Sequence, residues 1–315
     1  MMDYYNNNVT YYISLDGHVE LERYRYVYFI LTLAVYLLII CCNSVVISVI
    51  CANKSLHEPM YIFIAALLCN SLCGTTAFYP KLLIDLLSET RLISLESCIL
   101  QSFLIYTYGA SEFTLLSAMA YDRYVSICKP LQYATLVNMS TVRKLLFICW
   151  FLPSCEVGIA DILTYQVKLC KFQLHRIYCN NSALLKLSCG DTTVRNSYGL
   201  FVLVIAVFPP VIFVVYSYIR ILTVCLKNSR EFRRKALKTC FPHLIIFTNF
   251  SVTSCFEVIN GRLEGNIPHL LTMILSIENL IVAPLIHPVI YGLKLQEIFN
   301  RIKRMFWKKS NQISF

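Results

Sequence analysis

The amino-acid sequence predicts an all-α membrane protein: a bundle of seven transmembrane helices followed by a short amphipathic C-terminal helix. Three observations support this fold class. The 315-residue chain is 57% hydrophobic and only 15% charged, which is more apolar than the core of a water-soluble domain requires. Seven long apolar runs follow one another along the chain, and the basic residues gather between alternate runs.

Each of the seven runs has few or no charged residues, and most reach the length of roughly 20 residues that a bilayer-spanning helix needs. The expected spans are residues 26–51, 59–80, 97–121, 145–160, 196–219, 239–256 and 268–293. The fourth span is the shortest, and Glu156 and Asp161 lie at its far end. Seven spans place the two ends of the chain on opposite sides of the membrane.

The loop charges predict the orientation. With the N-terminus outside, 18 of the 28 Lys and Arg residues face the inner side, against four inner acids, Glu58, Asp122, Glu231 and Glu297. We therefore expect a multi-pass plasma-membrane protein with an extracellular N-terminus (1–25), a seven-helix domain (26–293) and a cytoplasmic amphipathic helix and tail (294–315). The basic residues lie beside membrane spans without interleaved stacking aromatics, so we expect contact with membrane lipid and no nucleic-acid partner.

The first twenty residues are polar and Tyr-rich, without a basic start or an apolar stretch. We therefore expect no cleavable leader, and the first span acts as its own insertion signal. In this topology the glycosylation sequons at Asn8 and Asn180 face outward. The sequons at Asn138 and Asn249 fall inside the cell and within a span, so we expect them to stay unmodified.

Most of the 15 cysteines lie within spans, where they serve as small packing residues. The exceptions are Cys98 at the start of the third span and Cys170, Cys179 and Cys189 in the long outer loop, which faces an oxidising compartment. Four cysteines allow three pairings, and their chemistry alone does not choose among them.

The sequence contains no Gly-rich phosphate loop, no His-Glu-x-x-His and no Cys/His cluster at zinc spacing, so we do not expect an enzyme. A transporter normally has paired internal repeats or matching broken helices, and no internal repeat is visible. The strongest local signal is Met-Ala-Tyr-Asp-Arg-Tyr-Val-Ser-Ile-Cys-Lys-Pro-Leu-Gln-Tyr at 119–133, at the inner end of the third span.

This run resembles the signature of odorant receptors, a family of rhodopsin-like G-protein-coupled receptors. Further similar motifs follow in order: Leu-His-Glu-Pro-Met-Tyr at 56–61, Pro-Lys-Leu-Leu at 80–83, Ser-Tyr-Ile with Ile-Leu at 217–222, Lys-Ala-Leu-Lys-Thr-Cys-Phe-Pro-His-Leu at 235–244 and Pro-x-x-Tyr at 288–291. Pro242 and the Asn-Ser-Leu at 70–72 resemble the fish-type branch. The resemblance covers about residues 25 to 300.

The resemblance implies a switch at the inner end, made of Asp122, Arg123, Tyr124, Tyr218 and Tyr291. An unpaired Arg is costly at a membrane helix end, so the adjacent Asp122 is expected to hold Arg123 in the resting state. Once free, Arg123 points into the cavity that receives the C-terminal helix of the G protein. The alternative is an interfacial ion pair without a signalling role.

Glu112 lies about three helical turns before Arg123, on the same face and near mid-membrane. The resemblance implies that it binds a sodium ion. Two neighbours depart from the family pattern, because Ser71 replaces an Asp and His287 replaces an Asn. The alternative is a protonated Glu112 hydrogen-bonded to Ser71, Asn43 or His287. Apart from this possible sodium, we expect no cofactor.

The resemblance also pairs Cys98 with Cys179, which leaves Cys170 for Cys189, and each bridge is worth roughly 2–4 kcal/mol. It places a lightly polar ligand pocket among the outer halves of the third, fifth, sixth and seventh spans. The candidate lining residues are Ile105, Tyr106, Gly109, Val202, Ala206, Ser254, Cys255, Val258 and Ile277. Ser251 stands where the family has an aromatic toggle residue.

Beyond the last span, an apolar helical face is expected on Leu295, Ile298, Phe299, Ile302, Met305 and Phe306, as in a helix that lies on the inner leaflet. The sequence therefore predicts an odorant receptor. It would bind a small extracellular molecule and activate a stimulatory, olfactory-type heterotrimeric G protein to raise cyclic AMP. The alternatives are a rhodopsin-like receptor for a lipid or peptide, and a membrane transporter.

Overall fold

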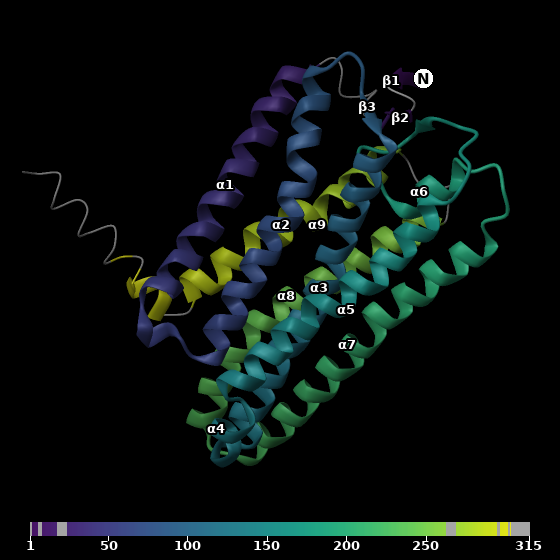
Figure 1. Ribbon diagram of the computed structural model, residues 1–315. Helices are drawn as coiled ribbons and strands as arrows, with labels where there is room; N and C mark the ends of the chain where they lie inside the picture. Colours follow the sequence, from purple (N-terminus) through teal and green to yellow (C-terminus); the bar gives the residue numbers. More distant parts are fainter. Residues whose placement is uncertain are drawn as a thin grey trace, which may run out of the picture.

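The long helices lie side by side as one bundle, with a small β-sheet at one end (Figure 1). The computed structural model describes residues 2–5, 8–17, 24–262, 269–294, 297–301 and 303; within these, only the backbone is described up to residue 10, from 257 to 278, and at 293 and 294. Seven long helices of the described chain form the bundle: α1 (Arg25–Ala52), α2 (Pro59–Leu87), α3 (Leu95–Cys128), α5 (Met139–Tyr165), α7 (Thr193–Lys227), α8 (Arg230–Arg262) and α9 (His269–Lys294). The predicted fold class is confirmed.

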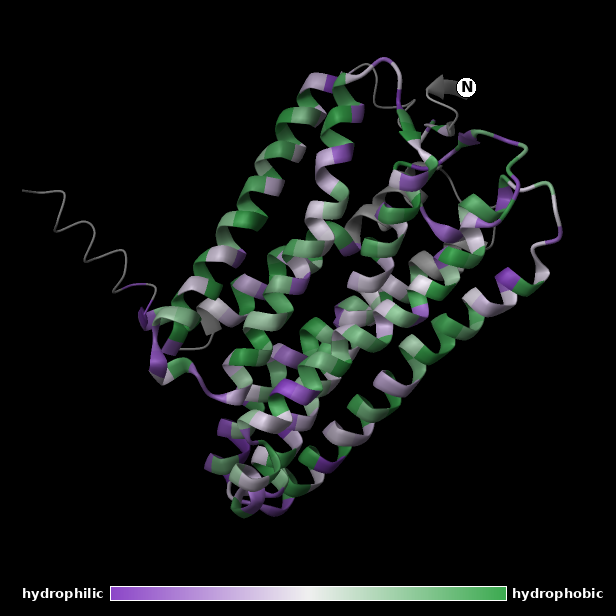
Figure 2. Ribbon diagram, in the orientation of Figure 1, coloured by the Kyte–Doolittle hydropathy of each residue, from purple (hydrophilic) through white to green (hydrophobic). Residues whose placement is uncertain are grey.

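The hydropathy of the helices fits a membrane protein. In Figure 2 the hydrophobic colour follows the long helices, and the hydrophilic colour gathers at their ends and in the loops. Within the described residues, α1, α2, α5 and α7 are long and apolar enough to span a membrane, and a shorter apolar stretch, Asn279–Gly292, lies in α9. The helix α3 is less apolar because it carries the ionisable residues considered below.

Most of the long helices extend beyond their predicted spans, and α2 and α5 are two examples. Helix α2 continues through Pro80 to Leu87, because one internal proline removes only one backbone donor and packed neighbours can satisfy the freed groups. Helix α5 begins at Met139, where the side chain of Asn138 accepts a hydrogen bond from the backbone N–H of Thr141 at 2.9 Å. Both extensions include polar residues that an apolar-run criterion leaves out.

Helix α3 lies at the centre of the bundle and contacts α2, α5, α7 and α8. Its approach to α2 depends on Gly74, since an added Cβ there would lie 2.4 Å from Cγ of the Tyr108 ring. The Tyr108 hydroxyl donates to the carbonyl of Asn279 in α9 at 3.2 Å. Tyr108 therefore links three helices near the middle of the bundle.

The sequence did not predict the β-sheet. Strand β2 (Asn8–Leu15) pairs antiparallel with β1 (Met2–Tyr5) and with β3 (Leu92–Ser94), and parallel with β4 (Gln173–Leu174) in the loop after α5. Ile13 and Leu15 are fully buried in a second hydrophobic cluster that also contains Cys98 and Cys179. At Gly17 an added Cβ would lie 2.5 Å from the backbone carbon of Arg176. The N-terminal segment is thus packed against the loop, and we call this end of the bundle the sheet end.

Short helices complete the connections: η2 (Lys54–Leu56), η3 (Pro130–Gln132), α4 (Tyr133–Leu136) and α6 (Asn181–Lys186). Residues 297–301 and 303 are helical. Ile298 is fully buried, Phe299 is 41% exposed, and Nη2 of Arg301 donates to Oγ of Ser55 at 3.2 Å. These contacts agree with the predicted C-terminal helix; Leu295, Ile302, Met305 and Phe306 lie outside the described residues.

Candidate functional site

The end of the bundle that carries α4 is the place of the predicted switch. Arg123 is half-buried near the end of α3, and its Nη2 is buried with no hydrogen-bond partner among the described residues. Asp122 is 2% exposed, and its Oδ1 accepts a hydrogen bond from the Tyr133 hydroxyl at 2.7 Å. Asp122 is therefore bonded to Tyr133 of α4, and the Nη2 group of Arg123 remains able to donate hydrogen bonds to another partner.

The expectation that Asp122 holds Arg123 stays a prediction, because the charges of the two side chains interact without forming an ion pair. In the described part of the chain no ion pair joins the two side chains. The physical reason is local, because consecutive residues of an α-helix point about 100° apart and do not face each other. Tyr133 was part of the quoted motif, and its hydroxyl is the partner that the sequence reasoning missed.

A second polar contact at this end joins three helices. The Tyr218 hydroxyl on α7 lies 2.7 Å from Nδ1 of His243 on α8, and Nε2 of His243 lies 2.9 Å from the carbonyl oxygen of Leu116 on α3. Since a carbonyl only accepts, Nε2 carries the proton and Nδ1 accepts from Tyr218. His243 is 2% exposed and was not among the predicted switch residues, although it lies in the motif at 235–244.

The remaining switch residues are arranged around this contact. Arg123, Tyr218 and Tyr291 lie close enough together to interact electrostatically, and the buried Tyr291 hydroxyl has no hydrogen-bond partner among the described residues. Tyr124 faces α7, where its ring centroid lies 6.5 Å from that of Tyr216. The structure thus gathers Arg123, Tyr218 and Tyr291 into one region, whereas Tyr124 lies against α7 and Asp122 is bonded to α4.

Glu112 is fully buried at the centre of the bundle. Its Oε2 accepts from Nδ2 of Asn70 at 2.8 Å, and its Oε1 lies 3.3 Å from Nε2 of His287. The other nitrogen of His287, Nδ1, lies 3.2 Å from Oγ of Ser71. The indole of Trp150 donates to Oδ1 of Asn70 at 3.3 Å, so the amide is fixed with its donors toward the acid.

Of the three partners expected for Glu112, only His287 touches it. Asn43 donates instead to the carbonyls of Ile39 and Pro284. Asn70, which precedes Ser71 in the sequence, was not among the expected partners. In the described chain no three His, Cys, Asp or Glu side chains are grouped to hold a metal ion.

Two disulfides close the loop at the sheet end. Cys98 at the start of α3 is bonded to Cys179, and Cys170 is bonded to Cys189. These are the pairs that the resemblance implied. The first bridge is fully buried within the second hydrophobic cluster, beside β2. It therefore joins the loop both to the bundle and to the N-terminal strand.

Asn180 does not have the exposure that a glycan needs. It is 7% exposed, and its Oδ1 caps α6 by accepting from the backbone N–H of Ala183 at 2.8 Å. The side chain of Asn8 lies outside the described residues. We expect Asn180→Gln to leave the electrophoretic mobility of the protein unchanged, and Asn8→Gln to abolish the shift caused by glycosidase treatment. A faster-migrating Asn180→Gln protein would contradict the first expectation.

The nine candidate pocket residues differ in how deeply the structure buries their side chains. Ile105 is buried, and an added Cβ at Gly109 would meet no atom within 4 Å, so there is open space beside this part of α3. Val202, Ala206 and Ser254 are half-buried, whereas Tyr106 and Cys255 are exposed and do not line an enclosed cavity here. The side chains of Val258 and Ile277 lie outside the described residues.

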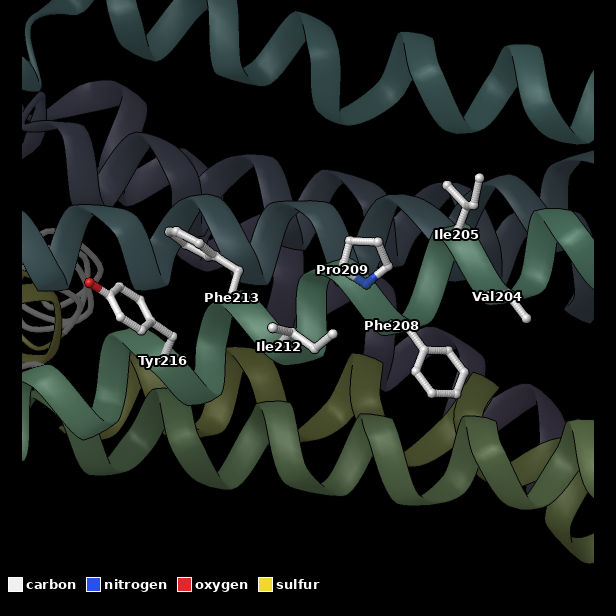
Figure 3. Close-up of a pocket in the computed structure, with 7 residues that line it drawn as sticks. All are labelled: Val204, Ile205, Phe208, Pro209, Ile212, Phe213 and Tyr216. Atoms are coloured by element: carbon white, nitrogen blue, oxygen red, sulfur yellow. The ribbon is translucent and has the colours of Figure 1, made fainter.

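A large apolar groove of about 530 Å³ runs along α7, and it contains none of the nine residues. Figure 3 shows its lining side chains, all from this one helix: Val204, Ile205, Phe208, Pro209, Ile212, Phe213 and Tyr216. Phe208 is 59% exposed and Ile212 is 66% exposed, so the groove opens outward from the bundle. Its position is that of a lipid-facing surface.

Comparisons with known proteins agree with the motifs. The family model described as "Olfactory receptor" matches residues 32–309. The human "Olfactory receptor 10K1" is 33% identical, over 96% of this chain and 97% of its own length. The mouse "Olfactory receptor 4B13" is also 33% identical, over 97% of this chain and 98% of its own length. The similarity therefore extends across the whole bundle, while the fish-type branch stays a prediction.

Proposed function

The chain belongs to the olfactory receptor family, and from this premise we propose that it binds a small extracellular odorant and activates a stimulatory heterotrimeric G protein to raise cyclic AMP. The observation that best supports coupling is the buried Nη2 of Arg123, which has no partner among the described residues. A guanidinium has five donors in a planar fork, suited to the oxygen atoms of an inserted helix end. The receptor is a switch and not an enzyme.

We place the sheet end outside the cell and the α4 end in the cytoplasm of a plasma-membrane protein. Two independent observations support this orientation. Both disulfides lie at the sheet end, and disulfides persist on the oxidising side of a membrane. Basic residues dominate the loops at the α4 end and the start of α8, as expected for the cytoplasmic side.

In this proposal the Tyr218–His243–Leu116 contact maintains the closed cytoplasmic end. The two hydrogen bonds, at 2.7 and 2.9 Å, join α7 and α8 to the backbone of α3. An outward displacement of α8 breaks the bond to Leu116 and exposes the region around Arg123. An odorant bound in the outer half of the bundle favours the arrangement with α8 displaced only if it binds that arrangement more tightly than the closed one.

The test is a panel of volatile odorants applied to cells that express the full chain, with cyclic AMP as the readout. At least one compound should give a saturable rise in cyclic AMP that depends on the expressed protein. Cells that express the chain at their surface and show ligand-dependent uptake without a cyclic AMP response would favour a transporter. A response only to lipids or peptides would favour a non-olfactory receptor.

We further propose that protein groups hold Glu112 and that no sodium ion is required. His287 lies beside Oε1 and Asn70 donates to Oε2, so each carboxylate oxygen has a nitrogen neighbour, although Oε1 accepts no hydrogen bond among the described residues. The Ser71 hydroxyl, one of the oxygens available to an ion, lies against His287. The groups around Glu112 are therefore arranged for hydrogen bonds with nitrogen atoms, and they fit a sodium ion poorly.

The expected result is that purified receptor melts at the same temperature in sodium chloride and in choline chloride at equal ionic strength. An ion that binds the folded state would instead raise the melting temperature with its concentration. Glu112→Gln serves as the matched variant, since it keeps shape and hydrogen bonding but cannot bind a cation by charge. A sodium-dependent rise in the wild type that is absent in Glu112→Gln would overturn the proposal.

A further inference from the structure

The outer end of α5 carries a buried carboxylate outside both sites described so far. Asp161 is 4% exposed and lies one turn before α5 ends at Tyr165. Its Oδ1 accepts from Nδ2 of Asn181 at 3.0 Å and from Oγ of Ser102 on α3 at 3.3 Å. Its Oδ2 is buried and has no partner in the described chain. A buried acid with so few donors is costly, so each donor matters.

Asn181 is the donor that comes from the extracellular loop. It is the first residue of α6, and its Nδ2 lies near three acceptors of α5: Oδ1 of Asp161, Oγ1 of Thr164 at 2.9 Å and the carbonyl of Ala160 at 3.3 Å. The Thr164 hydroxyl donates to the Ala160 carbonyl at 2.9 Å, which leaves its lone pairs free to accept from Asn181. The side-chain amide of Asn181 thus bonds the loop to acceptors that span one turn of α5.

The position of α6 explains why this contact affects ligand recognition. Ala183 and Leu184 of α6 are buried in the second hydrophobic cluster, together with the Cys98–Cys179 bridge and strand β2. The same end of α5 also receives a hydrogen bond from Nε of Arg195 on α7 to the carbonyl of Leu163 at 2.8 Å. The contact between Asp161 and Asn181 therefore lies where the loop, α3, α5 and α7 meet.

We propose that Asp161 and Asn181 are positioning residues for odorant binding: their hydrogen bond fixes α6, and with it the extracellular loop, over the outer half of the bundle. Neither residue needs to touch the ligand. The role in odorant binding rests on the proposed function, whereas the docking of the loop does not. The two parts are tested separately.

The first experiment measures docking without any ligand. A reporter cysteine at Leu185, a residue of α6 that is 4% exposed, is labelled on intact cells with a membrane-impermeant maleimide. Asn181→Asp places a second carboxylate against Asp161, which removes the donor and adds repulsion between like charges. Because a hydrogen bond to a charged group is lost, the labelling rate should rise by about tenfold or more.

Rescue and a matched control give the experiment its specificity. Asp161→Asn combined with Asn181→Asp again pairs one amide with one carboxylate, so labelling should return toward the parent rate. Asn196→Asp makes the same chemical change at an exposed residue whose amide donates to Thr192, and it should label like the parent. Parent-like labelling of Asn181→Asp, or a double variant that labels as fast as the single one, would overturn the docking role.

The second experiment uses whichever odorant the cyclic AMP panel identifies. At equal surface expression, Asn181→Asp should shift the concentration for half-maximal response upward by about tenfold or more, and the double variant should reverse that shift. An unchanged response, together with increased labelling, would reject the role in odorant binding while leaving the docking contact intact. If no odorant evokes cyclic AMP, the proposed function fails and the labelling result still stands.

Discussion

Arg123→Ala should reduce the odorant-evoked cyclic AMP response to that of cells without the receptor. The reason is that the substitution removes the guanidinium that interacts electrostatically with Tyr218 and Tyr291, and whose buried Nη2 has no hydrogen-bond partner among the described residues. No neighbour can replace it, because the nearby side chains are phenols and a neutral imidazole without a second free donor. The measurement is cyclic AMP accumulation at matched surface expression.

Two variants make this result interpretable. Arg143→Ala removes an exposed arginine at the same end of the bundle, where its Nε donates to the carbonyl of Met139, and the response should persist. Odorant affinity should remain largely intact in Arg123→Ala, since the change lies at the opposite end from the candidate pocket. An undiminished response in Arg123→Ala would reject the switch.

Cys98→Ser and Cys179→Ser should each retain most of the protein inside the cell. The bridge closes a sequence separation of 81 residues and is fully buried beside Ile13 and Leu15. Removal of a native disulfide typically costs about 2–5 kcal/mol, a large share of the stability of a domain. Surface immunolabelling divided by total protein measures the effect.

The double variant Cys98→Ser, Cys179→Ser should be no worse than either single variant, because one bond is lost in all three. Cys170→Ser provides the comparison within the same loop. Its bridge spans 19 residues against 81, so the chain-entropy model makes it weaker by about 1 kcal/mol, and more of this variant should reach the surface. Recovery of Cys98 as a free thiol in the mature wild-type protein is the result that would exclude the pairing.

The fold was predictable because the bilayer imposes a simple length rule on apolar runs. The same rule explains the errors at helix ends, since α2 and α5 continue into segments that include polar residues, which an apolar-run criterion leaves out. The β-sheet was not predictable in this way. Strand β2 finds its partners in β3 and β4, far along the chain, and no local pattern specifies such pairing.

The candidate site was predictable as a set of positions, but its contacts were not. Motif spacing brought attention to Arg123, Tyr218 and Tyr291, which the structure gathers together. Hydrogen bonds depend instead on side-chain direction. Adjacency in sequence did not indicate that Asp122 accepts a hydrogen bond from Tyr133, and the donor to Glu112 is Asn70, one residue before the expected Ser71.

The pairing of β2 also sets the order in which the sheet end can be built. Ser14 lies opposite Gln173, so the N-terminal strand has no complete partner set until α5 and part of the next loop have been synthesised. At roughly 5–20 residues per second, this delay is on the order of ten seconds. During that time Ile13 and Leu15, fully buried in the finished protein, remain uncovered. The N-terminal strand is therefore secured only after the segment with β4 has been made, and its apolar residues are available to chaperones until then.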